Sequence, residues 1–389
     1  MPFIPPAPGK RKLLYYTGAL CVTILVTAGI FAKNGWFPTA DPLSGKRTGW
    51  FGKPLAKNAA SAWNPIAVDS SPTPLPLSKE YIYAGSRLLA VEDANANPAP
   101  PADLAVWRQS DGYFYVMGGP GSQQTFYQWG GVTNQYDWPV PGDYDGDGKT
   151  DFSIFRPTDG TWWITYSSTG AYTSVQFGAS CSPTNGGCDV SSPTTYTGDL
   201  PAPADYDGDG KTDIALYRPS TGDWYVINSS SGQSGQFHFG TSGDTPASAD
   251  FDGDGRADYA LWRNSDHTFY IIQSSNGANL SVSFGSSGDK PVPADYDGDG
   301  KADIAVYRDG TTPTWYISQS SNNQLATVQY GASGDKLVQN DYDGDGKVDI
   351  AVWRPSTGDW YIRKSSDGLI RSEHWGQSGD IPVPAYYRR

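Results

Sequence analysis

The chain has 389 residues, a formal net charge of −13 and a pI near 4.6. Only 3 of its 41 acidic residues are Glu (Glu80, Glu92 and Glu373). Because Glu favours helices while Asp favours turns and hard-cation sites, this imbalance argues against a mainly helical protein. The acidic surface also argues against nucleic acid as a partner.

The N-terminus predicts export. Residues 1–12 are basic and end in Lys10, Arg11 and Lys12, and an uncharged run of 20 residues follows at 13–32. The basic flank predicts a cytoplasmic N-terminus, with the rest of the chain outside the cytoplasm. About 20 apolar residues suit a membrane-spanning anchor, whereas the core of a cleaved signal peptide has about 7 to 15. We expect a signal anchor, with a cleaved signal peptide as the alternative.

Residues 33–80 are rich in Pro, Ser, Ala and Gly and lack apolar periodicity. This composition is typical of an extended linker. The segment is therefore predicted to be a tether between the N-terminal segment and a domain that spans 81–389.

The predicted domain consists of repeats. A phrase of the type I-A-V-aromatic-R, followed by W-Y-I, occurs in six copies that begin at Leu104, Phe152, Ile214, Tyr259, Ile304 and Ile350. The last four acidic loops start 45, 45 and 46 residues apart, at Asp205, Asp250, Asp295 and Asp341. The first step, from Asp143 to Asp205, is 62 residues and contains an insertion around residues 180–196.

Each unit contains four short candidate strands separated by turn signals. Four strands per 40 to 50 residues is typical of a β-propeller blade, so we predict an all-β propeller. Six units are complete, and the terminal IPVPAYY (residues 381–387) is predicted to be the strand that closes a six-bladed ring. Seven blades, or a linear β-solenoid, are the alternatives.

Two cysteines lie in the long insertion. Cys181 and Cys188 flank a short Gly/Asn segment, in the part of the chain that is predicted to be exported. An oxidising compartment would let them pair, and neither the spacing nor the neighbouring residues suggest a metal or redox site. A disulfide between them is therefore predicted.

Five complete copies of an acidic loop carry Asp at positions 1, 3, 5 and 9. The residues are Asp143, Asp145, Asp147 and Asp151; Asp205, Asp207, Asp209 and Asp213; Asp250, Asp252, Asp254 and Asp258; Asp295, Asp297, Asp299 and Asp303; and Asp341, Asp343, Asp345 and Asp349. Alternate oxygen ligands in a tight loop can converge on one hard cation, as in the EF-hand loop, and the glycine after position 5 permits the sharp turn. The residue at position 7, such as Lys149, would bind the cation through its backbone carbonyl, while its side chain points to solvent.

This pattern predicts about five calcium sites. Ordinary Asp-Gly hairpin turns are the simpler explanation of one such loop, but four carboxylates at fixed offsets would repel one another without a cation. Five divalent ions would bring the net charge from −13 to about −3. The first unit offers only Asp93, Asn95, Asn97 and Asp103 without glycines, so its metal affinity is predicted to be weak or absent.

Residues 87–389 resemble the FG-GAP/VCBS repeat family, which includes the propeller of integrin α chains and bacterial surface proteins. Phe239-Gly240 and Phe284-Gly285, with the GDxPVPAD segments that follow, match the FG...GAP phrase, and D-x-D-G-D-G-x-x-D matches the calcium loop of the family. The resemblance implies a calcium-binding propeller used for adhesion or ligand recognition. It does not identify a ligand, because a fold does not fix a function.

The recurring aromatic pairs Trp224-Tyr225, Trp315-Tyr316 and Trp360-Tyr361 are expected to pack between blades, although stacking on sugars in a lectin is the alternative. Arg108, Arg156, Arg218, Arg263, Arg308 and Arg354 recur on one strand, which favours a structural partner.

The three histidines occur at unrelated offsets, and no G-x-S-x-G sequence is present, so an enzyme acting on polysaccharides is the least favoured function. We expect a membrane-tethered, calcium-dependent adhesion module with an extracellular protein or carbohydrate as its partner.

Overall fold

The computed structural model describes residues 80–84, 87–92, 101–117, 124–131, 136–181, 188, 196 and 198–387, with the backbone alone for residues 80–92. This part of the chain contains strands and no helix. Accordingly, no helix in it is both long and apolar enough to span a membrane. The predicted apolar segment 13–32 and the tether lie outside the described residues.

The chain divides into two units, Met1–Asn95 and Ala96–Arg389. In the first unit, β1 (Glu80–Ala84) and β2 (Arg87–Glu92) form an antiparallel two-stranded sheet with an irregular register at Ile82/Tyr83. Residues 81–95, which the repeat pattern had assigned to the propeller, therefore lie in the other unit. The propeller blades begin at β3.

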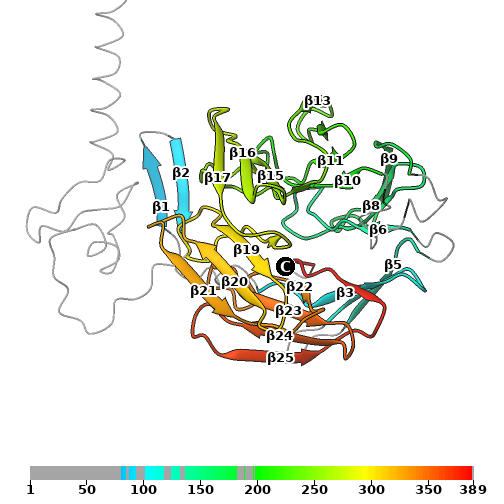
Figure 1. Ribbon diagram of the computed structural model, residues 1–389. Coiled ribbons are helices and arrows are strands. Elements are labelled where there is room, and N and C mark those ends of the chain that lie inside the picture. Colours follow the sequence, from blue (N-terminus) through cyan, green and yellow to red (C-terminus); the bar gives the residue numbers. More distant parts are fainter. Residues whose placement is uncertain are drawn as a thin grey trace, which may run out of the picture. The chain divides into compact units, whose positions relative to one another are not determined.

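The second unit is a six-bladed β-propeller (Figure 1). Every blade is an antiparallel sheet of four strands. Blade 1 consists of β26 (Asp380–Pro382), β3 (Ala105–Arg108), β4 (Tyr113–Val116) and β5 (Thr125–Gln128). Blade 2 consists of β6 (Trp138–Pro139), β7 (Phe152–Arg156), β8 (Thr161–Thr165) and β9 (Tyr172–Gln176). Blade 3 consists of β10 (Leu200–Pro201), β11 (Ile214–Arg218), β12 (Asp223–Ile227) and β13 (Ser234–His238).

The remaining blades repeat this order. Blade 4 consists of β14 (Asp244–Pro246), β15 (Tyr259–Arg263), β16 (Thr268–Ile272) and β17 (Asn279–Ser283). Blade 5 consists of β18 (Lys290–Pro291), β19 (Ile304–Arg308), β20 (Thr314–Ser318) and β21 (Leu325–Gln329). Blade 6 consists of β22 (Lys336–Leu337), β23 (Ile350–Arg354), β24 (Asp359–Arg363) and β25 (Ile370–His374). In Figure 1, β22 lies near the middle of the ring and β25 at its rim.

The last strand closes the ring. β26 pairs with β3, so that Asp380 lies opposite Arg108 and Ile381 opposite Trp107. The first blade therefore combines both ends of the repeat region, as predicted from IPVPAYY. The prediction of six blades is confirmed, and the alternatives of seven blades and a β-solenoid are excluded.

The core follows the alternation of side chains along each strand. In β12 the side chains of Trp224 and Val226 are buried, while Tyr225 on the opposite face is partly exposed. The second strands are almost wholly buried because neighbouring blades cover both faces, as in β11, where four consecutive residues are buried. Six apolar clusters form the core, and each joins side chains of two adjacent blades.

The recurring tryptophans are structural. Trp224, Trp315 and Trp360 are fully buried. Each indole donates its Nε1 hydrogen to the carbonyl that follows the fourth strand of its blade; Trp224, for example, binds the carbonyl of Phe239 at 3.1 Å. The expectation that these tryptophans pack between blades is confirmed, and they are not accessible for stacking on sugars.

Candidate metal centres

Five acidic loops connect the first and second strands of blades 2 to 6. They are loop 1 (143–151), loop 2 (205–213), loop 3 (250–258), loop 4 (295–303) and loop 5 (341–349). In loop 2 the carboxylate at position 1, Asp205, accepts hydrogen bonds from the backbone N–H of Gly208 at 2.6 Å and of Gly210 at 2.8 Å. Both glycines have φ near +80°, which residues with a Cβ rarely adopt. The glycines therefore wrap the loop around its first carboxylate.

The carboxylate at position 9 closes each loop from inside the protein. Asp213 is completely buried, and its two oxygens accept the backbone N–H groups of Tyr206 (2.8 Å) and Ser229 (2.7 Å). The equivalent residues in the other loops, Asp151, Asp258, Asp303 and Asp349, are equally buried. Burial raises the pKa of all five carboxyls, and that of Asp151 rises to about 6. A nearby cation would offset the unfavourable desolvation of these ionised carboxylates.

A pair of serines completes each site, and the sequence analysis missed it. Ser229 Oγ donates to Asp209 at position 5 (2.8 Å), and Ser230 Oγ donates to Asp207 at position 3 (2.6 Å). These serines lie between the third and fourth strands, and the same Ser-Ser pair recurs in blades 2, 4, 5 and 6. The signal in the sequence was the Ser-Ser dipeptide that lies shortly after each W-Y-I motif. In the first unit Gly119-Pro120 occupies the equivalent positions.

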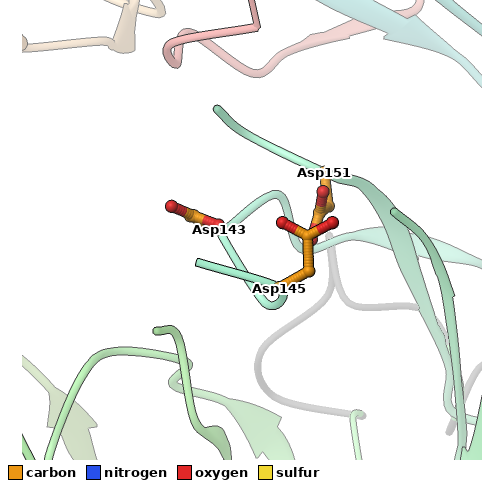
Figure 2. Close-up of side chains that lie close together, drawn as sticks. All are labelled: Asp143, Asp145 and Asp151. Atoms are coloured by element: carbon orange, nitrogen blue, oxygen red, sulfur yellow. The ribbon is translucent and has the colours of Figure 1, made fainter. Parts of the chain in front are cut away.

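The loops bring three carboxylates together in each case. One oxygen from each member lies within 4.8 Å of the others in the sets Asp143/Asp145/Asp151, Asp205/Asp207/Asp213, Asp250/Asp252/Asp254, Asp295/Asp297/Asp299 and Asp341/Asp343/Asp349. Figure 2 shows the first set. Ligands of one calcium ion, each at about 2.3 to 2.6 Å from it, lie at most about 5 Å apart. The fourth Asp of each predicted set lies outside the group: position 5 in loops 1, 2 and 5, and position 9 in loops 3 and 4.

Two oxygens give an independent sign that a cation fits. Oδ1 of Asp252 and Oδ1 of Asp343, both at position 3, are buried and accept no hydrogen bond within the described part of the chain. A buried carboxylate oxygen without a partner carries a large desolvation cost. Hard oxygen donors without Cys or His nearby suit calcium better than a soft metal. The residues therefore fit the ion that the sequence predicts.

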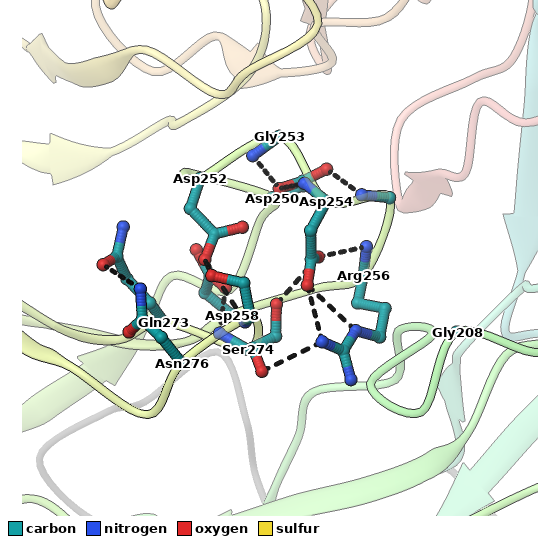
Figure 3. A network of polar contacts seen from close by, with 12 residues as sticks. Gly208, Asp250, Asp252, Gly253, Asp254, Arg256, Asp258, Gln273, Ser274 and Asn276 are labelled. Carbon is teal, nitrogen blue, oxygen red and sulfur yellow. Dashed lines mark hydrogen bonds and ion pairs between the residues drawn. The ribbon is translucent and has the colours of Figure 1, made fainter.

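Loop 3 differs because its position-7 cation forms an ion pair with a carboxylate of the same loop (Figure 3). Arg256 at position 7 forms an ion pair with Asp254 (Nη2 to Oδ2, 2.6 Å) and also donates to the carbonyl of Ser274. The Arg256 side chain also lies across Gly208 of loop 2, where a Cβ would come within 2.6 Å of it. The prediction that position-7 side chains point to solvent is therefore wrong for Arg256.

Lysines at position 7 also contact the neighbouring loop. Lys211, Lys301 and Lys347 lie across the position-4 glycines of the preceding loops, Gly146, Gly253 and Gly298. Their side chains therefore lie along the ring of loops, because the missing Cβ of each glycine leaves room for them, while Lys301 is also exposed to solvent.

The loops form a continuous ring. The backbone N–H at position 8 of each loop donates to the carbonyl at position 1 of the preceding loop: Thr212 to Asp143, Ala257 to Asp205, Ala302 to Asp250 and Val348 to Asp295. In the closing blade, Ala102 donates to Asp341, and Thr150 of loop 1 donates to Tyr386. The ligands at each candidate site are thus joined through the backbone to those at the next.

The closing blade has no complete acidic loop. Asp103 forms a β-bridge with Ala385, just as Asp213 at position 9 of loop 2 forms one with Ala204, the residue before position 1. By this correspondence Asp103 occupies position 9 of the closing loop, and Tyr386, which follows Ala385, occupies position 1. The sequence analysis placed Asp93 at position 1, but the first half of this loop comes from the other end of the chain. Tyr386 supplies a phenol that donates to Asn340 in place of a carboxylate. Asp93, Asn95 and Asn97 lie outside the described residues.

Comparison with known proteins agrees with these observations. The FG-GAP-like repeat model matches residues 205–261 and 250–306, which include loops 2, 3 and 4. Residues 205–306 thus contain FG-GAP-like repeats. No curated protein matches the chain.

The chain is similar to several solved structures at low identity. TolB from Acinetobacter baumannii is 14% identical over 75% of this chain and 67% of its own, with a TM-score of 0.51. An Agrocybe aegerita lectin that recognises non-reducing terminal N-acetylglucosamine is 13% identical over 73% of this chain and 95% of its own, with a TM-score of 0.45. Virginiamycin B lyase from Staphylococcus aureus is 10% identical over 72% of this chain and 85% of its own, with a TM-score of 0.40. At these identities the likeness concerns the fold alone.

The repeated arginines of the propeller are structural. Arg218 forms two hydrogen bonds with Asp199 (2.7 and 2.8 Å), and its guanidinium lies over the Tyr225 ring at 4.2 Å. The side chain of Asp199 is only 1% exposed. The other pairs are Arg108–Asp380, Arg156–Asp137, Arg263–Asp244, Arg308–Asp289 and Arg354–Asp335. The predicted structural partner is thus the Asp at the start of the first strand of the same blade or immediately before it.

Loss of one such arginine should destabilise the propeller. Arg218→Met leaves the buried Asp199 carboxylate without its cation, and we expect a loss of about 3 kcal/mol in the free energy of unfolding. Chemical denaturation would measure it. Arg371→Met is the matched control, because Arg371 and its partner Glu373 are both about one-third exposed, and it should cost less than about 1 kcal/mol. Equal losses would contradict a structural role of the buried pair.

The predicted disulfide is confirmed. Cys181 and Cys188 are bonded, with Cα atoms 5.2 Å apart, and both are buried. They lie in the connection between blades 2 and 3.

Two of the three histidines lie on outer strands beside a single Asp: His238 contacts Asp223 at 3.0 Å, and His374 contacts Asp359 at 2.8 Å. His267 is in a turn with φ of 58°.

The buried carboxylates predict opposite pH responses with and without calcium. Because burial raises the pKa of Asp151 to about 6, above its unfolded value of 3.8, the metal-free folded state binds more protons between these values. Metal-free stability should therefore be highest at low pH and fall as pH rises from about 4 to 6. Protons compete with calcium for the same oxygens, so calcium should stabilise the protein more at pH 7 than at pH 5.

Denaturant titrations at pH 5 and pH 7, with calcium and after its removal, would measure how the free energy of unfolding changes with pH in each case. Asp151→Asn, which removes one titrating group, should flatten the metal-free slope. An identical pH dependence with and without calcium would show that these carboxyls do not hold the ion.

Proposed function

We propose that the chain is a calcium-dependent binding module that is displayed outside the cytoplasm and acts without catalysis. One observation carries the proposal: each of the five loops brings three carboxylates together and has a fully buried Asp at position 9. FG-GAP repeats and the disulfide indicate an extracellular location, where calcium is abundant and disulfides persist. The apolar run 13–32, whether anchor or signal peptide, would deliver the propeller there.

In each loop, positions 1, 3, 5 and 9 would hold the ion, with the backbone carbonyl of position 7. Bound calcium would supply positive charge that neutralises the converging carboxylates. The chain's own groups prepare the site: the glycine N–H groups fix position 1, the serine hydroxyls orient positions 3 and 5, and burial fixes position 9. The ring of backbone bonds would transmit this order from blade to blade and give a rigid surface for a partner.

The partner class is an extracellular protein or carbohydrate, and the test is direct binding. Full-length protein would be applied to arrays of immobilised polysaccharides and surface proteins, with calcium and after its removal. Binding that requires calcium supports the module. Turnover of a polysaccharide, abolished by substitution of one carboxylate outside the loops, would show that the protein is instead an enzyme.

Carbohydrate recognition is the second candidate, because one groove of about 270 Å³ between blades 1 and 2 is lined with aromatic rings. Trp129 and Trp163 meet edge to face at 6.5 Å, and Tyr172 is 67% exposed. Flat aromatic faces with a nearby polar group, here Arg156, suit a sugar ring. Tyr172→Ala should then weaken glycan binding, while Phe126→Ala, which changes an exposed aromatic of blade 1 outside the groove, should not.

A further inference from the structure

A second groove, of about 280 Å³, lies between blades 5 and 6 beside loops 4 and 5. Its apolar walls include Ile317, Val328 and Ile350. Three cationic side chains line it, one from loop 5 and two from the end of β24: Lys347, Arg363 and Lys364. We call it the basic groove. It is notable in a chain whose net charge is −13.

Two of these cations are not part of the repeat. Arg363 and the following Lys364 occupy the end of the third strand, immediately before the serine pair. The equivalent pairs in the other blades with a serine pair are uncharged: Thr165-Tyr166, Ile227-Asn228, Ile272-Gln273 and Ser318-Gln319. The scaffold therefore does not require a cation at either position, and blade 6 has acquired two.

The cations are only partly neutralised by the protein. Lys364 pairs with Asp367 at 2.6 Å, but within the described part of the chain neither Arg363 nor Lys347 forms an ion pair. The single carboxylate that lines the groove is Asp297, at position 3 of loop 4. Calcium in loops 4 and 5 would neutralise Asp297 and its neighbours and leave the groove positively charged.

We infer that the basic groove binds a small organic anion, a carboxylate or sulfate on an apolar or sugar-sized body, and that calcium loading strengthens this binding. The guanidinium of Arg363 offers a fork of N–H donors that matches either anion, and Lys347 and Lys364 add charge. The apolar walls exclude water around the body of the ligand, which strengthens the charged contacts. The calcium dependence rests on the proposed function; the anion site itself does not.

The test uses matched probes on the full-length protein. Benzoate carries a carboxylate on an apolar ring, benzamide is its neutral counterpart, and benzenesulfonate distinguishes the two kinds of anion. With calcium bound, benzoate or benzenesulfonate should bind about tenfold more tightly than benzamide, as measured by ligand-observed NMR. Arg363→Gln and Lys364→Gln should each weaken anion binding several-fold without changing benzamide binding.

Lys336→Gln removes an exposed lysine of the same blade that does not line the groove, and should leave binding unchanged. Equal affinity for all three probes, or the same loss in Lys336→Gln, would overturn the anion site. A calcium-induced thermal shift is recorded for every sample. A shift without anion preference refutes only the groove, whereas anion binding without any calcium shift refutes only the calcium proposal.

Discussion

Removal of calcium should lower the thermal midpoint of unfolding by roughly 10 °C or more. Extracellular calcium sites have dissociation constants of about 0.1 to 1 mM, and free ion at ten times that value stabilises the fold by about 1.4 kcal/mol per site. Five independent sites would contribute about 7 kcal/mol, a large part of the stability of an ordinary domain. Differential scanning calorimetry of full-length protein, with millimolar calcium and after chelation, would measure the shift.

Two controls make this result specific. Magnesium at the same concentration should stabilise much less, because it demands an octahedral site and gives up water reluctantly. Asp213→Asn removes the buried carboxylate of loop 2 and should reduce the calcium-induced gain by about one fifth. Asp309→Asn, at a partly exposed position outside the loops, should preserve it. No thermal shift with calcium would refute the metal assignment.

The sequence predicted the repeat architecture because the same physical constraints act in every blade. Alternating apolar residues, as in W-Y-I, require a strand with one buried face, and a strand at the C-terminus that matches the first strand of a blade predicts closure of the ring. The carboxylate pattern also predicted the three residues that converge in each loop, although the fourth predicted Asp lies outside the group. Each motif is weak evidence alone, but its repetition in every unit made the prediction specific. The Cys181–Cys188 disulfide was predicted from the expected oxidising compartment.

The errors arose where two distant segments meet. Tyr386 occupies position 1 of the closing loop, but no local pattern in the first unit could reveal a residue contributed by the far end of the chain. Arg256 folds back onto Asp254 and across Gly208 because the neighbouring loop has no Cβ at that point, which only the ring geometry determines. The serine pairs were repeated and visible, but their distance of about 20 residues from the carboxylates concealed their role.

The metal loops and the Arg–Asp pairs stabilise the propeller in different ways. Each buried Arg–Asp pair ties the first strand of a blade to the second strand within the same sheet. The backbone bonds between loops instead connect successive blades. Calcium should therefore act mainly on the contacts between blades. The seam at blade 1, where Tyr386 replaces a carboxylate, should respond less to calcium than the other seams.

Truncation of the chain after Gly379 should therefore open the propeller even when calcium is present. The deletion removes β26, the bidentate pair between Asp380 and Arg108, and the buried side chains of Val383 and Tyr387 between blades 1 and 2. It also removes Tyr386, which joins loop 1 to blade 6. The lost ion pair and apolar burial together should cost more than about 5 kcal/mol, measured by denaturant unfolding in millimolar calcium.

The matched control ends at Tyr387 and keeps all of these contacts, so it should unfold at the midpoint of the full-length chain. Asp380→Asn, which keeps β26 but breaks the ion pair, should lose about 3 kcal/mol and fall between the two. A synthetic peptide of residues 380–389 should restore part of the lost stability to the chain that ends at Gly379, because it binds only the folded state. If that chain unfolds at the same midpoint as the control, ring closure by the last strand does not stabilise the propeller.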